Sequence, residues 1–254
     1  MIKYVHPPAI AGFIGADPLL DIFLCEEVFM FKRLELIIGN DHLENIKSKV
    51  VLVIGIGGVG GAAVEALVRS GIHNIILVDF DVVEESNLNR QRIAFKSTIG
   101  MKKVIAMKNI IMDINECCNA EVNELLVDEN NINSLFDKRI DYVIDACDDV
   151  KAKKAIINEC LKRKIKFISS MGTGNKLDPS LLEIVDIRKT SNDPLARIFR
   201  KWVKDSRIKE KIMVLSSREI PVKTGNVVGS TSFVPNSAGL LIASYVIRDI
   251  IKLN

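Results

Sequence analysis

Cysteine is scarce in this sequence of 254 residues, and the five cysteines follow no recognisable pattern. They form no C-x-x-C pair and show no disulfide-like spacing, which argues against a structural zinc site and fits a reducing compartment, where thiols stay free. The three histidines, His6, His42 and His73, show no metal-ligand spacing either. The cysteines are Cys25, Cys117, Cys118, Cys147 and Cys160.

Long hydrophobic runs are also missing. No window approaches the roughly 20 uninterrupted apolar residues that cross a bilayer. The N-terminal stretch is broken by Pro7, Pro8, Asp17 and Asp21 and has no small-residue cleavage site after it, so we expect no signal peptide. The net charge of +3 does not by itself indicate a nucleic-acid binder. With 48% hydrophobic and 26% charged residues, the composition predicts a globular, cytoplasmic protein with no membrane partner.

Apolar, β-branched runs alternate with helical segments between residues 50 and 170. Strands that are apolar throughout are typical of a parallel sheet covered on both faces. The alternation predicts an α/β fold with a doubly wound, Rossmann-like, mainly parallel sheet. We expect strands at 50–55, 74–79, 121–126, 141–146 and 165–170, and helices at 59–70, 102–115 and 151–164.

From residue 173 the rhythm changes, which predicts a smaller C-terminal α+β extension. Residues 181–190 and 210–217 alternate like half-exposed strands. Between them, Asp193 and Pro194 form an N-cap and first-turn pair for an amphipathic helix. The last helix is apolar nearly all round until Arg248, so we expect it in the core or against a second subunit.

The run "GIGGVG" directly follows the first strand and opens a helix. Gly55, Gly57 and Gly60 have the G-x-G-x-x-G spacing, which permits a tight turn, lets a phosphate approach the backbone and lets helix and strand pack closely. Asp79 ends the second strand about 20 residues later, where a carboxylate can accept ribose hydroxyls. A merely structural strand-to-helix turn is the alternative, but this context favours nucleotide binding.

The polar residues after the second strand indicate whether the bound nucleotide is ATP or NAD. Asn87, Arg90 and Gln91 crowd the phosphate end of the crevice, and Lys103 begins the next helix. Adenylation of a substrate requires cations over the α-phosphate and the departing pyrophosphate, whereas hydride transfer requires an apolar slot for nicotinamide. Taken singly, Arg90 and Lys103 are also typical of ordinary solvated charges.

Asp148 lies just beyond the end of the strand at 141–146, at the edge where open α/β sheets bind ligands. A carboxylate there can hold Mg²⁺ against a triphosphate. The alternative for Asp148 and Asp149 is capping of the next helix, and we expect one of the two to do so. Asp145 is a candidate to support the site, and Cys147 is expected to pack as a small apolar residue.

Together these segments resemble the adenylating superfamily of ThiF, MoeB and the ubiquitin-activating enzymes. The stretches that carry the resemblance are "GIGGVG", "LVDFDVVEESNLNRQ", "IGMKKV" and "YVIDACDD". The resemblance implies that ATP and Mg²⁺ are bound, with Asp148 as the metal ligand. Arg33 resembles an N-terminal arginine that dimeric members send into the partner's site, which implies a homodimer. The residues implied to contact the nucleotide are Gly57, Gly58, Asp79, Asn87, Arg90, Gln91 and Lys103.

The second half resembles the tRNA threonylcarbamoyladenosine dehydratase branch, on "SNDPLARIFRKWVK" and "GSTSFVPNSAG". This implies that ATP activates the carboxylate of the modified adenosine as an acyl-adenylate, and that a ureido nitrogen then closes a cyclic hydantoin. Thr173 and the stretch "SSREIPVK" depart from the expected pattern. On this interpretation, residues 30–172 are the ATP-binding core, residues 173–254 form a substrate and dimer region within the same compact unit, and residues 1–29 are an extension with no recognised counterpart.

Three other functions stay open. An activator of a ubiquitin-like sulfur-carrier protein shares the adenylation site, although no cysteine follows Cys160 to accept an acyl group. An NAD(P)-dependent oxidoreductase shares only the glycine motif, and a non-catalytic, nucleotide-gated tRNA-binding module is not excluded by any residue. A sulfur-transfer protein is also an expected candidate partner.

A basic cluster follows Pro194 on the expected amphipathic helix. Together with the resemblance it predicts tRNA contact, since phosphate binding uses lysine and arginine. The alternative is an ordinary solvated helix face. The predicted tRNA-binding residues are Arg197, Arg200, Lys201 and Lys204.

Overall fold

The computed structural model describes residues 30–253. The expected extension at 1–29 lies outside the described residues. Within the described chain, seven strands form one sheet in the order β3-β2-β1-β4-β5-β7-β6, and only β6 runs antiparallel to its neighbour. The strands are β1 (Val50–Ile54), β2 (Asn74–Val78), β3 (Asn119–Asn123), β4 (Tyr142–Asp145), β5 (Lys166–Ser170), β6 (Leu182–Asp186) and β7 (Met213–Ser217).

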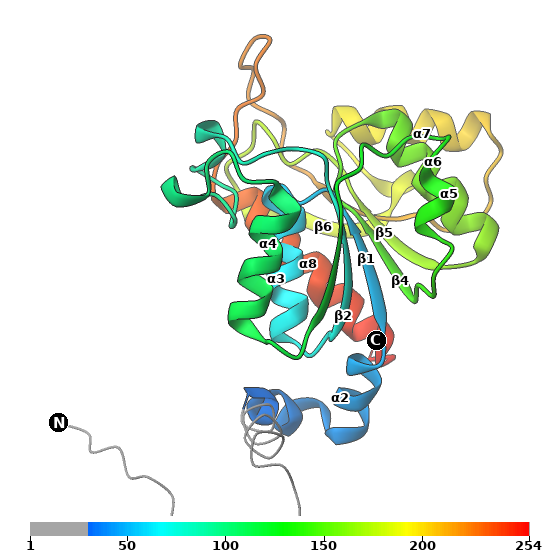
Figure 1. Cartoon of the computed structure of the whole chain (residues 1–254). Helices are drawn as coiled ribbons and strands as arrows, with labels where there is room; N and C mark the ends of the chain where they lie inside the picture. The colour runs from blue at the N-terminus through cyan, green and yellow to red at the C-terminus, as the bar shows by residue number, and fades with distance from the viewer. Residues whose placement is uncertain (1–29, 254) are drawn as a thin grey trace, which may run out of the picture.

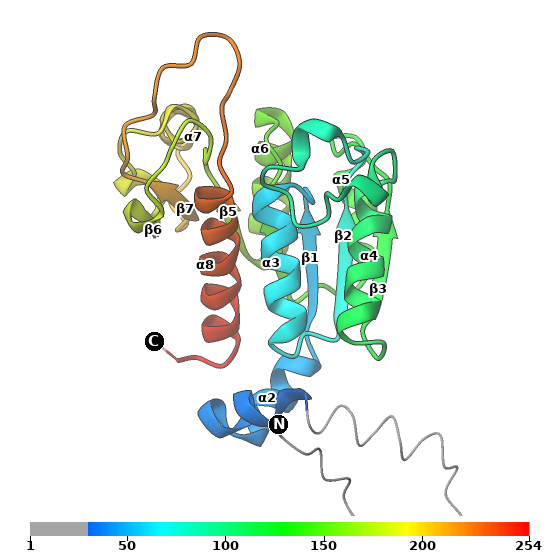
Figure 2. The ribbon, with the colours of Figure 1, turned by 90° about the vertical axis from the view of Figure 1, so that its left-hand side faces the viewer.

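Helices cover both faces of the sheet, which confirms the doubly wound α/β fold (Figure 1). On one face lie α3 (Gly58–Arg69), α4 (Lys103–Ile114) and α8 (Phe233–Ile250), and on the other lie α5 (Ile132–Leu135), α6 (Val150–Arg163) and α7 (Pro194–Asp205). A helix over residues 30–38 and α2 (Asn40–Lys47) lie below the amino ends of the strands (Figure 2). Gly39 separates these two helices with a φ of 81°, a conformation that favours glycine. Short 3₁₀ turns occur at Glu85–Asn87, Lys96–Thr98, Pro179–Leu181 and Ile187–Lys189.

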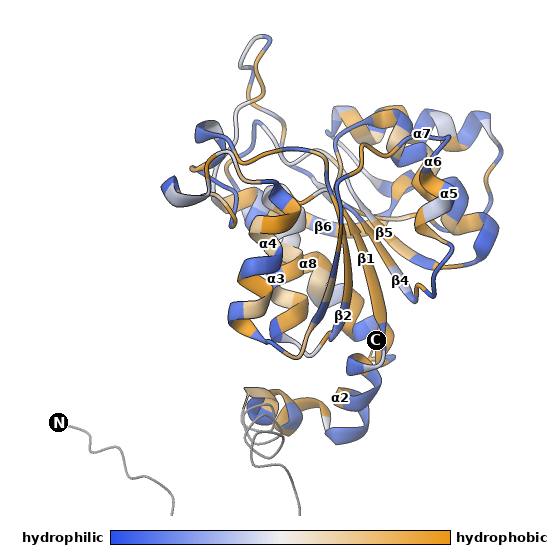
Figure 3. Cartoon of the chain, in the orientation of Figure 1, coloured by the Kyte–Doolittle hydropathy of each residue, from blue (hydrophilic) through white to orange (hydrophobic). Residues whose placement is uncertain are grey.

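The core follows the apolar strands. In Figure 3, the orange of apolar residues runs along β1 and α8, while the outer helix surfaces carry more blue. The α8 helix packs closely against α3, because Gly239 has no side chain: a Cβ atom there would stand 2.3 Å from the Val59 carbonyl oxygen. The last helix is therefore part of the core, as one of the two sequence alternatives predicted.

Two strand predictions were wrong. The strand β3 spans Asn119–Asn123 rather than 121–126, because it pairs with β2 from its first residue. The second strand of the expected C-terminal extension, β7, is not half-exposed. It inserts between β5 and β6, where Leu215 joins the core under α8 and Val214 joins the core under α7. The C-terminal residues thus continue the same sheet.

Every helix in the described residues is too short or too polar to cross a membrane.

Candidate functional site

A cavity of about 760 Å³ opens at the carboxyl ends of β1, β2 and β4. This is the edge at which open α/β sheets bind ligands. It brings together nearly all the side chains that the sequence predicted to contact a nucleotide or metal. The predicted residues that line it are Gly55, Gly57, Gly58, Asp79, Asn87, Arg90, Gln91, Lys103 and Asp148.

The glycines of the β1–α3 turn have separate roles. A Cβ atom at Gly60 would stand 1.7 Å from the Gly55 carbonyl oxygen, so this glycine serves close packing, and it does not line the cavity. At Gly58 a Cβ would stand 2.9 Å from Cβ of Pro235 on α8. At Gly57, which lines the cavity, the surrounding space is open, the nearest atom being Gln91 Nε2 at 3.8 Å. Gly57 is therefore the position at which a ligand can approach bare backbone.

The first turn of α3 is suited to an anion. Gly57 is the N-cap residue, and no side chain caps the free N–H groups of this turn. These groups and the positive end of the helix dipole form a ready site for phosphate.

Asp79 is held firmly where β2 ends. Its two carboxylate oxygens accept backbone hydrogen bonds from Ile56 at 2.6 Å and from Asp81 at 2.9 Å. The side chain is 9% exposed and lines the cavity. Each oxygen keeps a lone pair, so the carboxylate can also accept hydroxyl groups of a ligand.

Lys103 places a buried positive charge at the cavity wall. Its side chain is 8% exposed, and its ammonium lies 2.7 Å from Oδ2 of Asp81. Across the cavity, Arg90 is fixed through Nη1 to the Ser86 carbonyl and to Oδ1 of Asn89, both at 2.9 Å. These two cations converge on one volume rather than pointing separately into solvent.

Asn87 and Gln91 are both buried and line the same cavity as the two cations. Asn87 accepts from the Glu84 backbone N–H at 3.1 Å, which fixes its amide. Oε1 of Gln91 is buried and has no hydrogen-bond partner among the described residues. A buried, unpartnered oxygen is costly, so a ligand donor fits here.

One side of the cavity is apolar. Phe80 and Leu126 line it while remaining 49% and 56% exposed, and Val82, Leu125 and Val127 stand beside them. Exposed apolar side chains next to a phosphate site provide a surface on which a purine ring can lie.

The two aspartates after β4 divide their roles. Asp149 caps α6 by accepting from the Ala152 N–H at 2.7 Å. Asp148 is exposed, lines the cavity, and forms no hydrogen bond or ion pair with any residue in the described part of the chain. Its carboxylate is therefore available to a cation.

Within residues 30–253 no group of three or more His, Cys, Asp or Glu side chains is placed to hold a metal. A single carboxylate suits Mg²⁺, which is usually held by one or two carboxylates together with substrate phosphates.

A buried network supports the loop that carries Asp148. Oδ2 of Asp145 lies 3.0 Å from the Lys153 ammonium and accepts from the Ser169 hydroxyl at 2.6 Å. The other oxygen accepts from the Cys147 N–H at 3.3 Å and from its thiol at 3.1 Å. Burial raises the pKa of the Cys147 thiol far above its usual range, and the Asp145 charge raises it further. Cys147 therefore packs beside Asp145 as a hydrogen-bonded thiol.

Some predicted residues lie elsewhere. Arg33 is exposed on the helix over 30–38, at the end of the sheet opposite the cavity (Figure 1). Arg200 is half-buried and donates from Nη1 to the carbonyl and hydroxyl of Thr190 at 2.9 and 2.7 Å, so its guanidinium is partly occupied by the fold. The other three predicted tRNA-binding residues, Arg197, Lys201 and Lys204, are exposed on α7.

Sequence reasoning missed several residues of the cavity. Thr173, Ser230 and Pro235 come from the C-terminal third of the chain, and Lys151 comes from the first turn of α6. The motif "GSTSFVP", which includes Ser230 and Pro235, was the available signal, but nothing local in it indicates contact with the glycine loop.

The fold and the cavity define a nucleotide-binding α/β protein whose site is equipped with cations for phosphates rather than with a closed apolar slot for nicotinamide. The model of the ThiF family matches residues 31–252, and the chain belongs to that family.

Two similar proteins are named for the same activity. The chain is 41% identical over 240 residues to a tRNA threonylcarbamoyladenosine dehydratase of Bacillus subtilis, covering 87% of this chain and 94% of that protein. It is similar to the crystal structure of Escherichia coli tRNA N6-threonylcarbamoyladenosine dehydratase in complex with ATP, with a TM-score of 0.84 and 31% identity over 89% of this chain and 95% of that one. The complex of that enzyme with AMP gives the same values.

Proposed function

We propose that this chain catalyses the ATP-dependent cyclising dehydration of threonylcarbamoyladenosine in tRNA, giving the cyclic hydantoin through an acyl-adenylate. The observation that carries the proposal is the single cavity that joins an open glycine turn, a ribose-type carboxylate, two converging cations and a free carboxylate. Relatives that match nearly the whole chain are named for this activity, and one of them has been crystallised with ATP and with AMP.

In the first step, a carboxylate oxygen of the threonylcarbamoyl group attacks the α-phosphorus of ATP. The bond from that phosphorus to the bridging oxygen of the β-phosphate breaks, and pyrophosphate leaves. Backbone N–H groups at Gly57 and the first turn of α3 bind phosphate oxygens. Lys103 and Arg90 offset the charge that builds on the phosphates, while Asp79 holds the ribose. Asp148 would hold Mg²⁺, which would supply further charge neutralisation for the triphosphate when bound.

In the second step, a ureido nitrogen of the same group attacks the activated carbonyl carbon and loses its proton, and AMP leaves with the former carboxylate oxygen. The nucleoside thus loses one water. Because the nucleophile and the carbonyl belong to one group, ring closure gains the advantage of proximity. The chain needs to bind and orient the group and to keep water out, and it needs no covalent nucleophile of its own.

We further propose that the active unit is a homodimer in which Arg33 completes the partner's site. Arg33 lies far from its own chain's cavity, and Leu36 and Ile37 on the same helix are 79% and 81% exposed. Large apolar side chains exposed together suit a protein interface. A sulfur-transfer protein stays a proposed additional partner, which co-purification with tagged protein tests.

The test is to incubate purified protein with Mg²⁺, ATP and tRNA carrying threonylcarbamoyladenosine, digest the tRNA mildly and weigh the modified nucleoside. We expect the loss of one water, dependent on ATP and abolished by chelation of Mg²⁺. Asp148→Asn should lower the rate by about 100-fold, in the range seen for loss of one transition-state charge partner. The matched control Asp137→Asn changes an exposed aspartate outside the cavity lining and should leave the rate unchanged.

An unchanged nucleoside mass, with a substrate proven on another dehydratase, would contradict the proposal. ATP–pyrophosphate exchange that appears only with a small ubiquitin-like protein would instead indicate a sulfur-carrier activator.

A further inference from the structure

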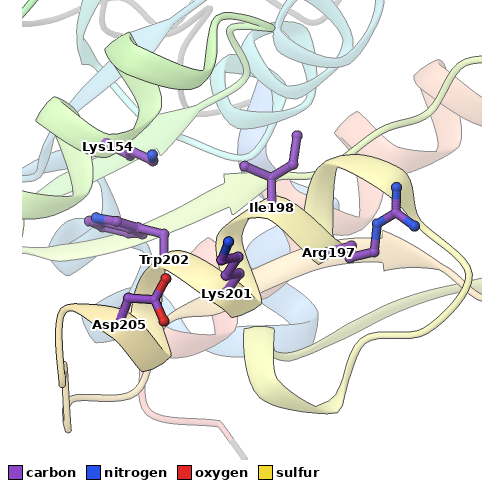
Figure 4. Close-up of a pocket in the computed structure, with 6 residues that line it drawn as sticks. All are labelled: Lys154, Arg197, Ile198, Lys201, Trp202 and Asp205. Atoms are coloured by element: carbon purple, nitrogen blue, oxygen red, sulfur yellow. The ribbon is translucent and has the colours of Figure 1, made fainter.

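A second cavity, of about 450 Å³, lies between α6 and α7. Five of its six lining residues come from α7 at spacings of four: Arg197, Lys201 and Asp205 form one row, and Ile198 and Trp202 form the row beside it. Residues four apart share one face of a helix, so these side chains form one surface. Lys154 of α6 closes the cavity opposite Trp202 (Figure 4).

The aromatic part of this surface is rigid on one side and open on the other. Trp202 is half-buried and meets the buried Phe199 edge to face, with ring centroids 5.7 Å apart. The Lys154 ammonium stands 5.8 Å from the centroid of the indole ring. A lysine side chain is flexible. The Lys154 side chain can therefore move away from the indole, so that a flat ring stacks there while the ammonium binds a phosphate.

The charges around the indole favour an anion. Lys154, Arg197 and Lys201 supply three positive charges against the single carboxylate of Asp205. None of the three cations forms an ion pair with a residue in the described part of the chain, and Arg197 and Lys201 are exposed. Ile198 is 45% exposed beside the indole and extends its apolar surface. A flat apolar ring joined to a negative group matches this combination, and a nucleotide is such a group.

The second cavity adjoins the catalytic one through α6. Lys151 and Ala152 line the ATP cavity, and Lys154 follows one turn later on the same helix. At 1.5 Å per residue, Lys151 and Lys154 are about 4.5 Å apart along the helix axis. The start of α7 is joined to the ATP cavity as well. Its N-cap Asp193 is paired with the buried Lys176 at 3.2 Å, and Lys176 follows the loop that carries Thr173.

We propose that this second cavity binds one unstacked loop nucleotide of the tRNA substrate, with its base on Trp202 and its phosphate between Lys201 and Arg197. The assignment rests on the proposed function for the identity of the RNA. Stacking on an aromatic side chain requires an unpaired base, so the cavity selects loop RNA over duplex RNA. It thereby positions the strand while the modified adenosine occupies the neighbouring cavity.

Trp202 is the only tryptophan of the chain, so its fluorescence reports this cavity alone. The experiment titrates the full-length protein, without ATP, with a synthetic RNA hairpin that has the loop of an anticodon arm. We expect saturable quenching of the fluorescence, and no quenching with a blunt RNA duplex or with inorganic polyphosphate, which has charge but no bases. Binding of labelled RNA is followed in parallel by fluorescence anisotropy.

Variants separate this site from a general basic surface. Lys201→Glu should weaken hairpin binding about tenfold or more, whereas the matched reversal Lys209→Glu, in the exposed segment after α7, should weaken it far less. Trp202→Leu should lose about tenfold in affinity and Trp202→Phe should retain most of it, since stacking is worth roughly tenfold per base. Circular dichroism spectra confirm that each variant is folded.

Hairpin binding without any change in Trp202 fluorescence would overturn the proposal, as would equal losses in Lys201→Glu and Lys209→Glu. Because the assay contains no ATP and follows no chemistry, its result is independent of the dehydration assay. If the protein dehydrates the nucleoside but RNA does not quench Trp202, only the RNA site proposed here is wrong. If RNA quenches Trp202 but no dehydration occurs, the RNA site stands and the proposed activity is wrong.

Discussion

The ammonium of Lys153 lies 3.0 Å from Oδ2 of Asp145, and neither side chain is exposed to solvent. This pair lies directly below the loop that carries Asp148. A charge left alone in such an interior is far more costly than the pair itself. The Lys153–Asp145 pair therefore stabilises the fold and sets the position of the loop that carries Asp148 at the same time.

Lys153→Met should reduce the free energy of unfolding by about 3–5 kcal/mol, because Asp145 would be left as an uncompensated buried charge. The double variant Lys153→Met with Asp145→Asn should recover a large part of that loss. Urea unfolding followed by circular dichroism measures both. A single variant as stable as the wild type would mean that water reaches Asp145.

Gly57 and Gly60 should respond differently to alanine. At Gly57 the added methyl group meets no atom closer than 3.8 Å, so the fold should be kept, while the methyl occupies the phosphate approach and weakens ATP binding about tenfold or more. At Gly60 the methyl would overlap the Gly55 carbonyl, so the fold should lose about 3 kcal/mol or more. Calorimetry with ATP and thermal unfolding distinguish the two effects, and the reverse pattern would contradict the roles assigned here.

Lys103→Met should lower turnover by about 100-fold, because it removes one cation from the phosphate site. Stability should change by less than about 1 kcal/mol, since the partner Asp81 is 44% exposed. Lys102→Met is the matched control: the Lys102 side chain is 42% exposed, pairs with Glu124 at 3.4 Å, donates to the Phe80 carbonyl and lies outside the cavity lining. Equal rates for the two variants in the nucleoside mass assay would remove Lys103 from the mechanism.

Cys147 should resist alkylation. Its raised pKa keeps the thiol protonated at pH values near 8.5, where an exposed cysteine ionises. The stability of the fold should depend on pH in the same direction. Because folding raises the pKa of this thiol, its contribution favours the folded state below the unfolded pKa and is lost as the pH rises above that value. Peptide mass spectrometry after iodoacetamide treatment at pH 8.5 should show slow labelling of Cys147 relative to the exposed Cys117. Fast labelling would reopen a nucleophilic role.

Arg33→Ala and Asp148→Asn should each have a strongly reduced rate alone and should regain activity when the two are mixed, if Arg33 acts in the partner's site. A mixed dimer then contains one cavity with both groups intact. Refolding or co-expressing differently tagged subunits, followed by the mass assay, measures this. Absence of activity in purified mixed dimers would place Arg33 outside the site.

Local patterns predicted most of the site. Gly57, Asp79 and Asp148 each follow a strand directly, so their position at the carboxyl edge of the sheet follows from the order of elements along the chain. Long-range pairings could not be predicted in this way. Nothing near Lys103 indicates its contact with Asp81, and nothing in the sequence between 210 and 217 shows that β7 enters the sheet between two earlier strands.

The difference between local patterns and long-range pairings also explains why the exposure of β7 was predicted wrongly. The alternation of residues 210–217 predicted a half-exposed strand, and β7 ends in two polar residues, Ser216 and Ser217. Both are buried because strands lie on either side of β7 and helices cover both its faces.

The contact between Pro235 and Gly58 has a consequence for synthesis of the protein. The helix that bears Pro235, α8, follows the other described helices along the chain, and it covers β5, β6 and β7 on the same face of the sheet as α3. A growing chain on the ribosome therefore carries its glycine turn long before it can close the pocket around it. Until α8 has emerged, the apolar face that it covers stays open to water. A truncation that removes α8 therefore removes Pro235 from the cavity wall together with the part of the core that α8 supplies.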